Sequence, residues 1–187
     1  MVEDGRGSFL SDIEEIRARA RKKMDDGAVT EGYLADREKV ISVLNEVLAT
    51  EIVCVLRYKR HYFTASGINA EPIAEEFMQH AQEEQTHADL VAKRIMQLGG
   101  EPDFNPEGLA TRSHSQYVEG HNLVDMIRED LVAERVAVES YSEIIRWLGN
   151  DDPTTRRVME EILEKEEEHA DDMVTLLATL DPKGRAK

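Results

Sequence analysis

Two stretches of this sequence place a glutamate and a histidine three residues apart, Glu84 with His87 and Glu166 with His169. Each pair stands inside a long pattern of helical periodicity, so both side chains of a pair leave the same helix face about one turn apart. A carboxylate oxygen and an imidazole nitrogen placed in this way can bind one metal ion. The spacing therefore makes metal binding the first chemistry to consider.

Apolar residues around the second pair follow the same helical spacing: Met159, Ile162, Met173, Leu176 and Leu180. The pair thus occupies positions that should face a core. Burying an unpartnered carboxylate is costly, so buried charges are normally paired or bound to metal. One such pair could be part of a solvated helix face in a chain with 39 acidic residues. Two pairs on two such faces favour metal binding.

The sequence around these pairs belongs to an internal repeat. Residues 48–58 align with residues 131–141, and this alignment matches Glu51 to Glu134, 83 positions later. The two glutamate–histidine pairs are 82 positions apart. The repeat predicts two helical hairpins of one design, each supplying a lone glutamate from its first helix and a glutamate–histidine pair from its second.

Four long helices are predicted to position these residues, over residues 34–64, 72–98, 122–148 and 153–180. Pro72 and Pro153 suit first helical turns, and glycines or prolines follow the predicted helix ends. Short turns make the helices of each hairpin antiparallel neighbours, whereas residues 99–121 are long enough to cross the bundle. The predicted fold class is an all-α, up-down four-helix bundle with a long crossover between its second and third helices.

The four glutamates lie 12 to 15 residues from the turn of their hairpin. This separation is about 18 to 22 Å at roughly 1.5 Å per residue, so they should meet near the middle of the bundle. Four helices that contribute a Glu, a Glu-x-x-His, a Glu and a Glu-x-x-His form carboxylate centres that bind two iron or two manganese ions.

A separate short helix is predicted over residues 8–27, opened by Ser11 with Glu14 as a capping box and closed by Gly27. Five cations lie in residues 17–23, where the helix dipole favours them near a C-terminus. A DNA-contacting tail is the alternative interpretation. The predicted division of the chain is an N-terminal extension (1–33), the bundle (34–181) and a short tail (182–187).

Composition restricts the class of protein further. The 187 residues are 41% apolar, and no run approaches the roughly 18 apolar residues of a membrane span, so a single non-membrane domain is expected. Residues 1–5 lack the basic-then-apolar order of a secretory signal, and the single cysteine, Cys54, excludes an intramolecular disulfide. Both features favour a cytoplasmic location. The net charge of −16 argues against nucleic acid as a partner and is compatible with attracting cations.

Over most of residues 36–180 the chain resembles the bacterioferritins and the bacterioferritin-like miniferritins. Four segments carry the resemblance and hold all six candidate ligands: residues 45–51, 84–87, 130–134 and 166–169. The resemblance implies a ferritin-like bundle with a ferroxidase centre, at which Fe²⁺ is oxidised by O₂ or H₂O₂ for iron storage or detoxification.

The resemblance also implies a role for each ligand. Glu84 and Glu166 would bridge two iron ions, Glu51 with His87 would complete one, and Glu134 with His169 would complete the other. Two iron ions per subunit are therefore expected, with manganese as the alternative metal.

Three positions depart from the family pattern. Bacterioferritins bind haem through a Met directly after the Glu of the second helix; Gln85 stands there, so haem is not expected. Bacterioferritins have a short fifth helix where this sequence has only residues 181–187, so a homo-oligomeric shell of either 12 or 24 subunits is expected. Miniferritins often carry a cysteine pair near the metals, whereas Cys54 is alone and is expected to be a small buried residue.

Other residues near the six ligands receive structural interpretations. Tyr58 and Tyr141, each seven residues after a terminal glutamate, are expected to be packed hydrogen-bonding residues, and a role as a radical or in orienting a ligand is the alternative. Asp130 is a candidate acceptor for the N–H of a ligand imidazole. His80, one turn before Glu84, is expected to be a hydrogen-bonded histidine near the core rather than an extra ligand.

Three functions are compatible with the sequence. The first is iron oxidation and storage, and the second is another di-metal enzyme, such as a peroxidase or a manganese catalase, because a fold does not determine the chemistry. The third is a non-catalytic helical module with a relic site. Metal analysis with Fe²⁺ and H₂O₂ turnover assays separates the first two, and a protein that binds neither Fe²⁺ nor Mn²⁺ would favour the third.

Overall fold

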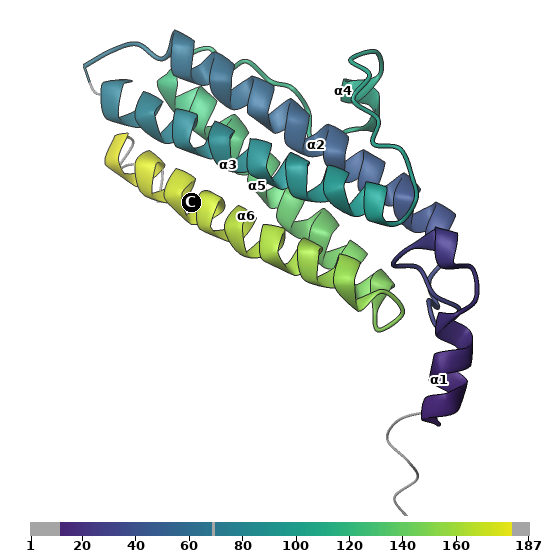
Figure 1. Ribbon diagram of the computed structural model, residues 1–187. Coiled ribbons are helices and arrows are strands. Elements are labelled where there is room, and N and C mark those ends of the chain that lie inside the picture. Colours follow the sequence, from purple (N-terminus) through teal and green to yellow (C-terminus); the bar gives the residue numbers. More distant parts are fainter. Residues whose placement is uncertain (1–11, 69, 181–187) are drawn as a thin grey trace, which may run out of the picture.

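The computed structural model describes residues 12–68 and 70–180, whose regular elements are all helices (Figure 1). Its four long helices are α2 (Arg37–Thr64), α3 (Ala70–Gln97), α5 (Leu123–Leu148) and α6 (Pro153–Leu180). The predicted four-helix bundle is confirmed, with small shifts at the helix ends. Within the described residues, no helix is long and apolar enough to cross a membrane.

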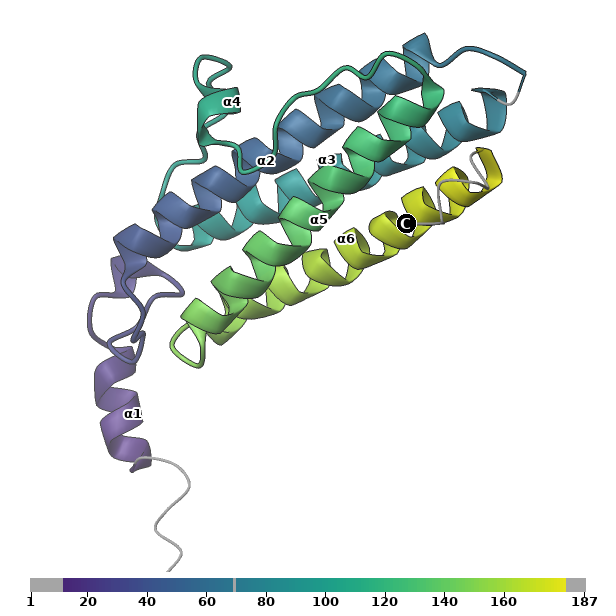
Figure 2. The same ribbon diagram turned by 180° about the vertical axis from the view of Figure 1, so that it is seen from behind.

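The four helices form two antiparallel hairpins that dock against each other. α2 packs against α3, and α5 against α6, while α3–α6 and α2–α5 contacts join the hairpins. Between α3 and α5 the chain crosses the length of the bundle, as predicted, so these two helices run in the same direction (Figures 1 and 2).

Capping residues explain where the long helices begin. The side chains of Asp36, Asn122 and Asp152 each accept a hydrogen bond from a backbone N–H in the first turn of α2, α5 and α6. Pro153 takes the first position of α6, where the missing N–H costs nothing. Gly149, with φ of 51°, ends α5 in a conformation that L side chains avoid.

The crossover lies along α2 and is anchored near both of its ends. Asn45 Oδ1 accepts the Asp103 N–H at 2.8 Å near the start. Near the end, the buried Arg57 donates to the Ser115 hydroxyl and to the Gln116 carbonyl oxygen, each at 3.1 Å. These contacts hold the connection against α2 near both of its ends.

Two predictions of local structure were wrong. The crossover, for which no helix was predicted, contains a one-turn helix, α4 (Leu109–Arg112), which lies beside α2 in a loop that protrudes from the bundle (Figure 2). The N-terminal helix is shorter than predicted, because α1 (Ile13–Ala20) ends early and is followed by a 3₁₀ turn, η1 (Met24–Asp26). Asp12, rather than Ser11, caps α1 by accepting the Glu14 N–H at 2.8 Å.

The early end of α1 has a physical reason. Arg17 and Arg21, and likewise Arg19 and Lys23, are four residues apart, and like charges at this spacing destabilise a helix. Lys23 instead adopts a positive φ of 48°. Ser11 and the predicted tail, residues 182–187, lie outside the described residues.

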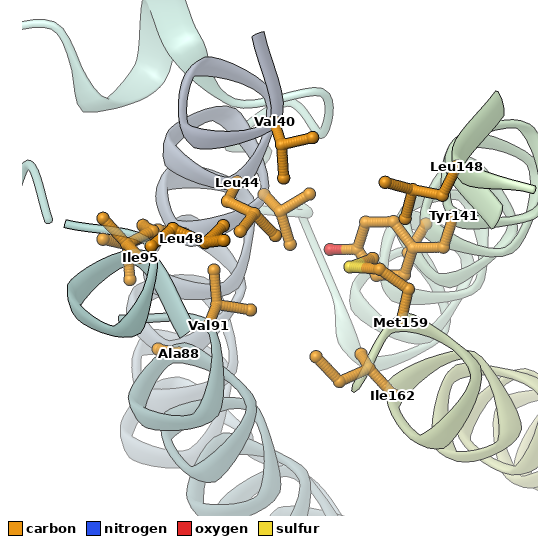
Figure 3. Packing of buried hydrophobic residues seen from close by; sticks show 13 residues of the cluster. Val40, Leu44, Leu48, Ala88, Val91, Ile95, Tyr141, Leu148, Met159 and Ile162 are labelled. Carbon is orange, nitrogen blue, oxygen red and sulfur yellow. The ribbon is translucent and has the colours of Figure 1, made fainter. Parts of the chain in front are cut away.

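Two apolar clusters fill the bundle on either side of its middle. The first takes residues from all four long helices (Figure 3): Val40, Leu44, Leu48, Ala88, Val91, Ile95, Tyr141, Leu148, Met159 and Ile162. The second comprises Tyr58, Ile73, Phe77, Ala81, Met126, Ile127 and Met173. Along every long helix, charged residues lie between the segments that supply the two clusters. This buried polar layer is the candidate functional site.

Candidate metal centre

The polar layer is formed by the six residues that the repeat singled out. α2 supplies Glu51, α3 supplies Glu84 and His87, α5 supplies Glu134, and α6 supplies Glu166 and His169. All six are buried, with no more than 5% of any of them exposed. The structure thus brings together, at the middle of the bundle, side chains that are up to 118 positions apart in the sequence.

The six side chains form two overlapping groups that could each hold a metal ion. One group is Glu51, Glu84, His87 and Glu166, and the other is Glu84, Glu134, Glu166 and His169. Within each group the ligand atoms lie within 4.8 Å of one another. Glu84 and Glu166 belong to both groups, so their carboxylates lie between the two positions.

Both histidines turn the same ring atom toward the carboxylates. His87 Nδ1 lies 3.0 Å from Glu166, 3.3 Å from Glu84 and 3.4 Å from Glu51. His169 Nδ1 lies 3.5 Å from Glu84 and 3.9 Å from both Glu134 and Glu166. The Nδ1 atoms of both imidazoles are therefore directed at the two groups of carboxylate oxygens.

Several of these buried atoms have no hydrogen-bond partner among the described residues: Glu51 Oε2, Glu84 Oε1, Glu134 Oε2, Glu166 Oε1 and His169 Nδ1. Buried polar atoms in folded proteins are nearly always paired, because losing hydration without compensation is unfavourable. Oxygen atoms from carboxylates together with imidazole nitrogens are ligands that suit iron, manganese and zinc. The arrangement fits a pair of divalent cations.

Two tyrosines from opposite hairpins fix the outer carboxylates. Tyr141 of α5 donates to Glu51 Oε1 on α2, and Tyr58 of α2 donates to Glu134 Oε1 on α5. Both tyrosines are fully buried. This confirms the prediction that they are packed, hydrogen-bonding residues, and it leaves the second oxygen of each carboxylate facing the centre.

One outer contact was missed by the sequence analysis. Glu83 Oε2 lies 2.6 Å from His169 Nε2, so the Nε2–H is donated to this carboxylate and Nδ1 is left as the free lone pair. The repeat gave no signal for it, because the position equivalent to Glu83 is Lys165, which pairs with Glu168. The two halves of the centre are therefore not equivalent in their surroundings.

The prediction for Asp130 was wrong. This carboxylate accepts a hydrogen bond from Arg57 Nε at 2.8 Å and lies 2.8 Å from His61 Nδ1, and neither partner belongs to the six-residue set. Asp130 is one helical turn from Glu134, but its carboxylate pairs with the buried guanidinium and imidazole of α2. Its contacts connect α5 to α2 and, through Arg57, to the crossover.

Burial and mutual charge set the protonation of the centre. Burial, and then the negative charge of Glu84, raise the pKa of Glu134, Glu166 and Glu51, the last to about 8. Burial acts on Glu84 as well, but the neighbouring imidazoles of His169 and His87 outweigh it and hold the pKa of Glu84 well below its ordinary range.

The pKa values of the two histidines are raised as well. Burial disfavours their charged forms, yet the surrounding carboxylates raise the pKa of His87 far above its usual value and that of His169 to about 9. Without metal, the centre therefore carries protons at neutral pH. Cations that bind there must displace those protons.

Three further residues were singled out by the sequence. Cys54 is buried, as predicted, and burial raises the pKa of its thiol. Gln85 is exposed on α3 and donates to Asp89 at 3.0 Å. His80 is fully buried, lies 3.2 Å from the Tyr58 hydroxyl, and stacks on His169 with ring centroids 4.0 Å apart. Burial and the charge of His169 lower the pKa of His80 to about 4.

The chain is similar to known proteins in sequence and in fold. Residues 41–182 match the family described as a ferritin-like domain. The bacterioferritin of Desulfovibrio desulfuricans is 30% identical over 140 residues, which cover 74% of each chain. The X-ray structure of that bacterioferritin, described with its diiron site in different catalytic states, is similar with a TM-score of 0.69 at 27% identity, covering 80% of this chain and 84% of the other.

The names of two other relatives describe different properties, a dodecameric assembly and the protection of DNA. A dodecameric thioferritin, the bacterioferritin-related protein of Bacteroides fragilis, has a TM-score of 0.73 at 28% identity and covers 82% of this chain and 94% of its own. The DNA protection during starvation protein of Pyrococcus furiosus is 31% identical over 137 residues, which cover 72% of this chain and 74% of that protein.

Proposed function

Because the chain belongs to the ferritin-like family, and within it resembles the bacterioferritins, we propose that it oxidises Fe²⁺ at its buried carboxylate layer and stores or detoxifies the product. In this proposal the catalytic residues are the metal ligands: Glu51, Glu84, His87, Glu134, Glu166 and His169. The alternative metal is manganese, because the ligand types suit both ions.

The observation that carries the proposal is the overlap of the two ligand groups. Two groups that share Glu84 and Glu166 can hold two cations side by side, with these carboxylates as bridges. Glu51 with His87 would complete one position and Glu134 with His169 the other. The unpaired buried oxygens supply the negative charge that two divalent cations require.

Two neighbouring Fe²⁺ ions suit the chemistry of oxygen reduction. Together they release two electrons, the number that converts O₂ and two protons into H₂O₂, or H₂O₂ and two protons into two molecules of water. Carboxylates can change how many oxygens bind a metal, so one ligand set can accommodate Fe²⁺ and Fe³⁺. Glu83 supports this by fixing the ring of His169 through Nε2.

We further propose that the chain assembles into a homo-oligomeric shell of 12 or 24 subunits. The dodecameric relative from B. fragilis supports a shell, and several large apolar side chains are exposed on the single chain, including Leu56, Phe63 and Val132. Native mass measurement tests this directly: a mass near 12 or 24 times 21.2 kDa is expected, and a monomer or dimer would contradict it.

Stopped-flow oxidation of Fe²⁺ in air by the metal-free protein tests the proposed chemistry. We expect a fast phase that saturates near two Fe²⁺ per chain. Glu84→Ala and Glu166→Ala should each abolish it, because a bridging carboxylate serves both ions. Gln85→Ala is the matched control, since Gln85 neighbours Glu84 on α3 but is exposed, and this variant should keep the fast phase.

Two results would contradict the proposal in different ways. Undiminished fast oxidation in Glu166→Ala would show that the centre is elsewhere. A wild-type protein that binds Mn²⁺ and disproportionates H₂O₂ without oxidising Fe²⁺ would retain the centre and replace the function by that of a catalase.

A further inference from the structure

A second cluster of possible ligands lies beside the dinuclear centre, on the side that faces solvent. Glu76 and His80 come from α3 and Asp172 from α6. His80 Nε2 lies 3.5 Å from Glu76 Oε1 and 3.5 Å from Asp172 Oδ2. The histidine is fully buried, whereas the side chains of Glu76 and Asp172 are 32% and 44% exposed.

The hydrogen bonds of His80 determine which of its ring nitrogens carries the proton. The Tyr58 hydroxyl has a single hydrogen and donates it to Glu134, so toward His80 its oxygen can only accept. His80 Nδ1 therefore carries the ring proton and donates it to Tyr58. In the neutral imidazole, Nε2 then carries a lone pair aimed at two carboxylates, and it has no hydrogen-bond partner within residues 12–68 and 70–180.

Three electron-rich atoms that face one another at these distances can be held together by a cation between them. Donor atoms held by one tetrahedral ion at about 2.1 Å lie roughly 3.4 Å apart, close to the observed separations of 3.5 Å. Direct hydrogen bonds of this type would be shorter, at about 2.7 to 3.2 Å. One imidazole with two carboxylates is a ligand set for a divalent first-row transition metal.

The internal repeat shows that these three residues are not required by the dinuclear centre itself. At the equivalent positions of the other hairpin stand Val158 for Glu76, Ile162 for His80 and Leu90 for Asp172. Ile162 belongs to the first apolar cluster and Val158 packs against it. Apolar residues at these positions are therefore sufficient to pack the bundle. The polar residues Glu76, His80 and Asp172 must have a purpose other than packing.

We propose that Glu76, His80 and Asp172 form a third cation site, which binds a divalent transition-metal ion next to the dinuclear centre. The site goes beyond the proposed oxidation of iron, because it neither needs nor supplies a redox step. It lies one stacked ring from the centre, since His80 packs on His169 with an interplanar angle of 19°. A cation held there is exposed to solvent through Glu76 and Asp172.

Equilibrium dialysis of the full-length, metal-free protein against Zn²⁺, followed by elemental analysis, tests the third site. Wild type should bind three Zn²⁺ per chain, and Asp172→Asn and His80→Gln should each bind two. Asp172 is partly exposed, so Asp172→Asn should fold even if the buried His80 variant does not. Asp171→Asn, an exposed neighbour on α6, is the matched control and should bind three.

A second pair of variants separates the third site from the dinuclear centre. The variant Glu84→Ala/Glu166→Ala should retain one Zn²⁺ per chain, which is lost when Asp172→Asn is added. In Zn²⁺-soaked crystals, an anomalous difference peak is expected between the three side chains. Equal Zn²⁺ content in wild type and Asp172→Asn, or no anomalous peak at this position, would overturn the third site while leaving the dinuclear centre standing.

Discussion

Two tyrosine hydroxyls connect the hairpins through the outer carboxylates of the centre. Tyr141 reaches from α5 to Glu51 on α2, and Tyr58 reaches from α2 to Glu134 on α5. Each substitution leaves a buried carboxyl oxygen without its hydrogen-bond donor, which costs about 1 to 3 kcal/mol, so Tyr141→Phe and Tyr58→Phe should each lower the free energy of unfolding of the metal-free protein by about that amount. Chemical denaturation measures it.

Tyr62→Phe is the control for this prediction, because Tyr62 lies on the same helix as Tyr58 but its ring packs against Phe63, outside the centre. Its stability should equal that of wild type within about 0.5 kcal/mol. If the two buried variants were as stable as this control, the tyrosines would not hold the carboxylates in place.

The protons of the metal-free centre predict how stability depends on pH. The carboxyl pKa values raised on folding, that of Glu51 to about 8, stabilise the folded state most at low pH. That stability is lost as pH rises from the unfolded pKa of about 4.3 through the folded values. His169, raised to about 9, acts in the same direction: its contribution is complete below pH about 6.5 and lost as pH rises through 9.

We therefore expect the melting temperature of the metal-free protein to fall between pH 6 and pH 9, and Zn²⁺ affinity to rise over the same range by about tenfold per pH unit for each proton released. The low pKa of Glu84 has no effect there, since its contribution is complete above pH about 4.3. Differential scanning calorimetry and Zn²⁺ titration at three pH values measure both trends. Glu51→Gln should reduce the slope; a melting temperature that rises with pH would contradict the assignment.

At the level of helices, Asp152 joins three segments at the start of α6. It accepts the backbone N–H of Thr155 at 2.9 Å, the hydroxyl of Tyr33 at 2.9 Å and a guanidinium N–H of Arg94 on α3 at 2.9 Å. Burial raises the pKa of Asp152, but the hydrogen bonds from Thr155 and Tyr33 outweigh it, and the pKa is lowered.

Asp152→Asn keeps a capping oxygen but removes the charge, so it should lower the free energy of unfolding at pH 7 by about 2 to 3 kcal/mol. Because the pKa of Asp152 is lower in the folded than in the unfolded protein, its ionised carboxylate stabilises the fold above the unfolded pKa of about 3.9. This stabilisation is lost as pH falls through the pKa of the folded state. The difference between wild type and variant should therefore close below about pH 4. The exposed neighbour variant Asp151→Asn should behave as wild type at both pH values.

The sequence predicted the features that depend on residues close together in the chain. It did not predict contacts between residues that only folding brings together. The four helices and six central residues could be predicted, because periodicity, capping residues such as Asn122, and the repeat are local patterns. The partner of Asp130 could not, because a carboxylate on α5 can reach several cations and only packing selects Arg57. Glu83 was missed for a related reason: nothing in its immediate sequence shows that His169, on another helix, turns Nε2 toward it.

At the level of the whole molecule, charge bears on nucleic acid as a partner. The chain carries a net charge of −16, and its clustered cations, residues 17–23, lie on α1 and the segment that follows it. We expect weak or no retardation of duplex DNA at physiological salt, measured by gel shift, because phosphate attraction needs a positive surface. Tight binding that falls steeply with added salt and disappears when residues 1–27 are deleted would contradict this.

The polar layer also has a consequence for the order of events in folding. Each hairpin is a local unit joined by a short turn, but each of the two ligand groups takes donors from both hairpins. The groups are complete only after the hairpins have docked, so cations should bind tightly to the docked state alone. Interactions absent from the folding transition state slow unfolding and leave the folding rate unchanged. Bound Zn²⁺ should therefore lengthen the lifetime of the folded chain, measured by unfolding in denaturant, with no effect on the rate at which the hairpins meet.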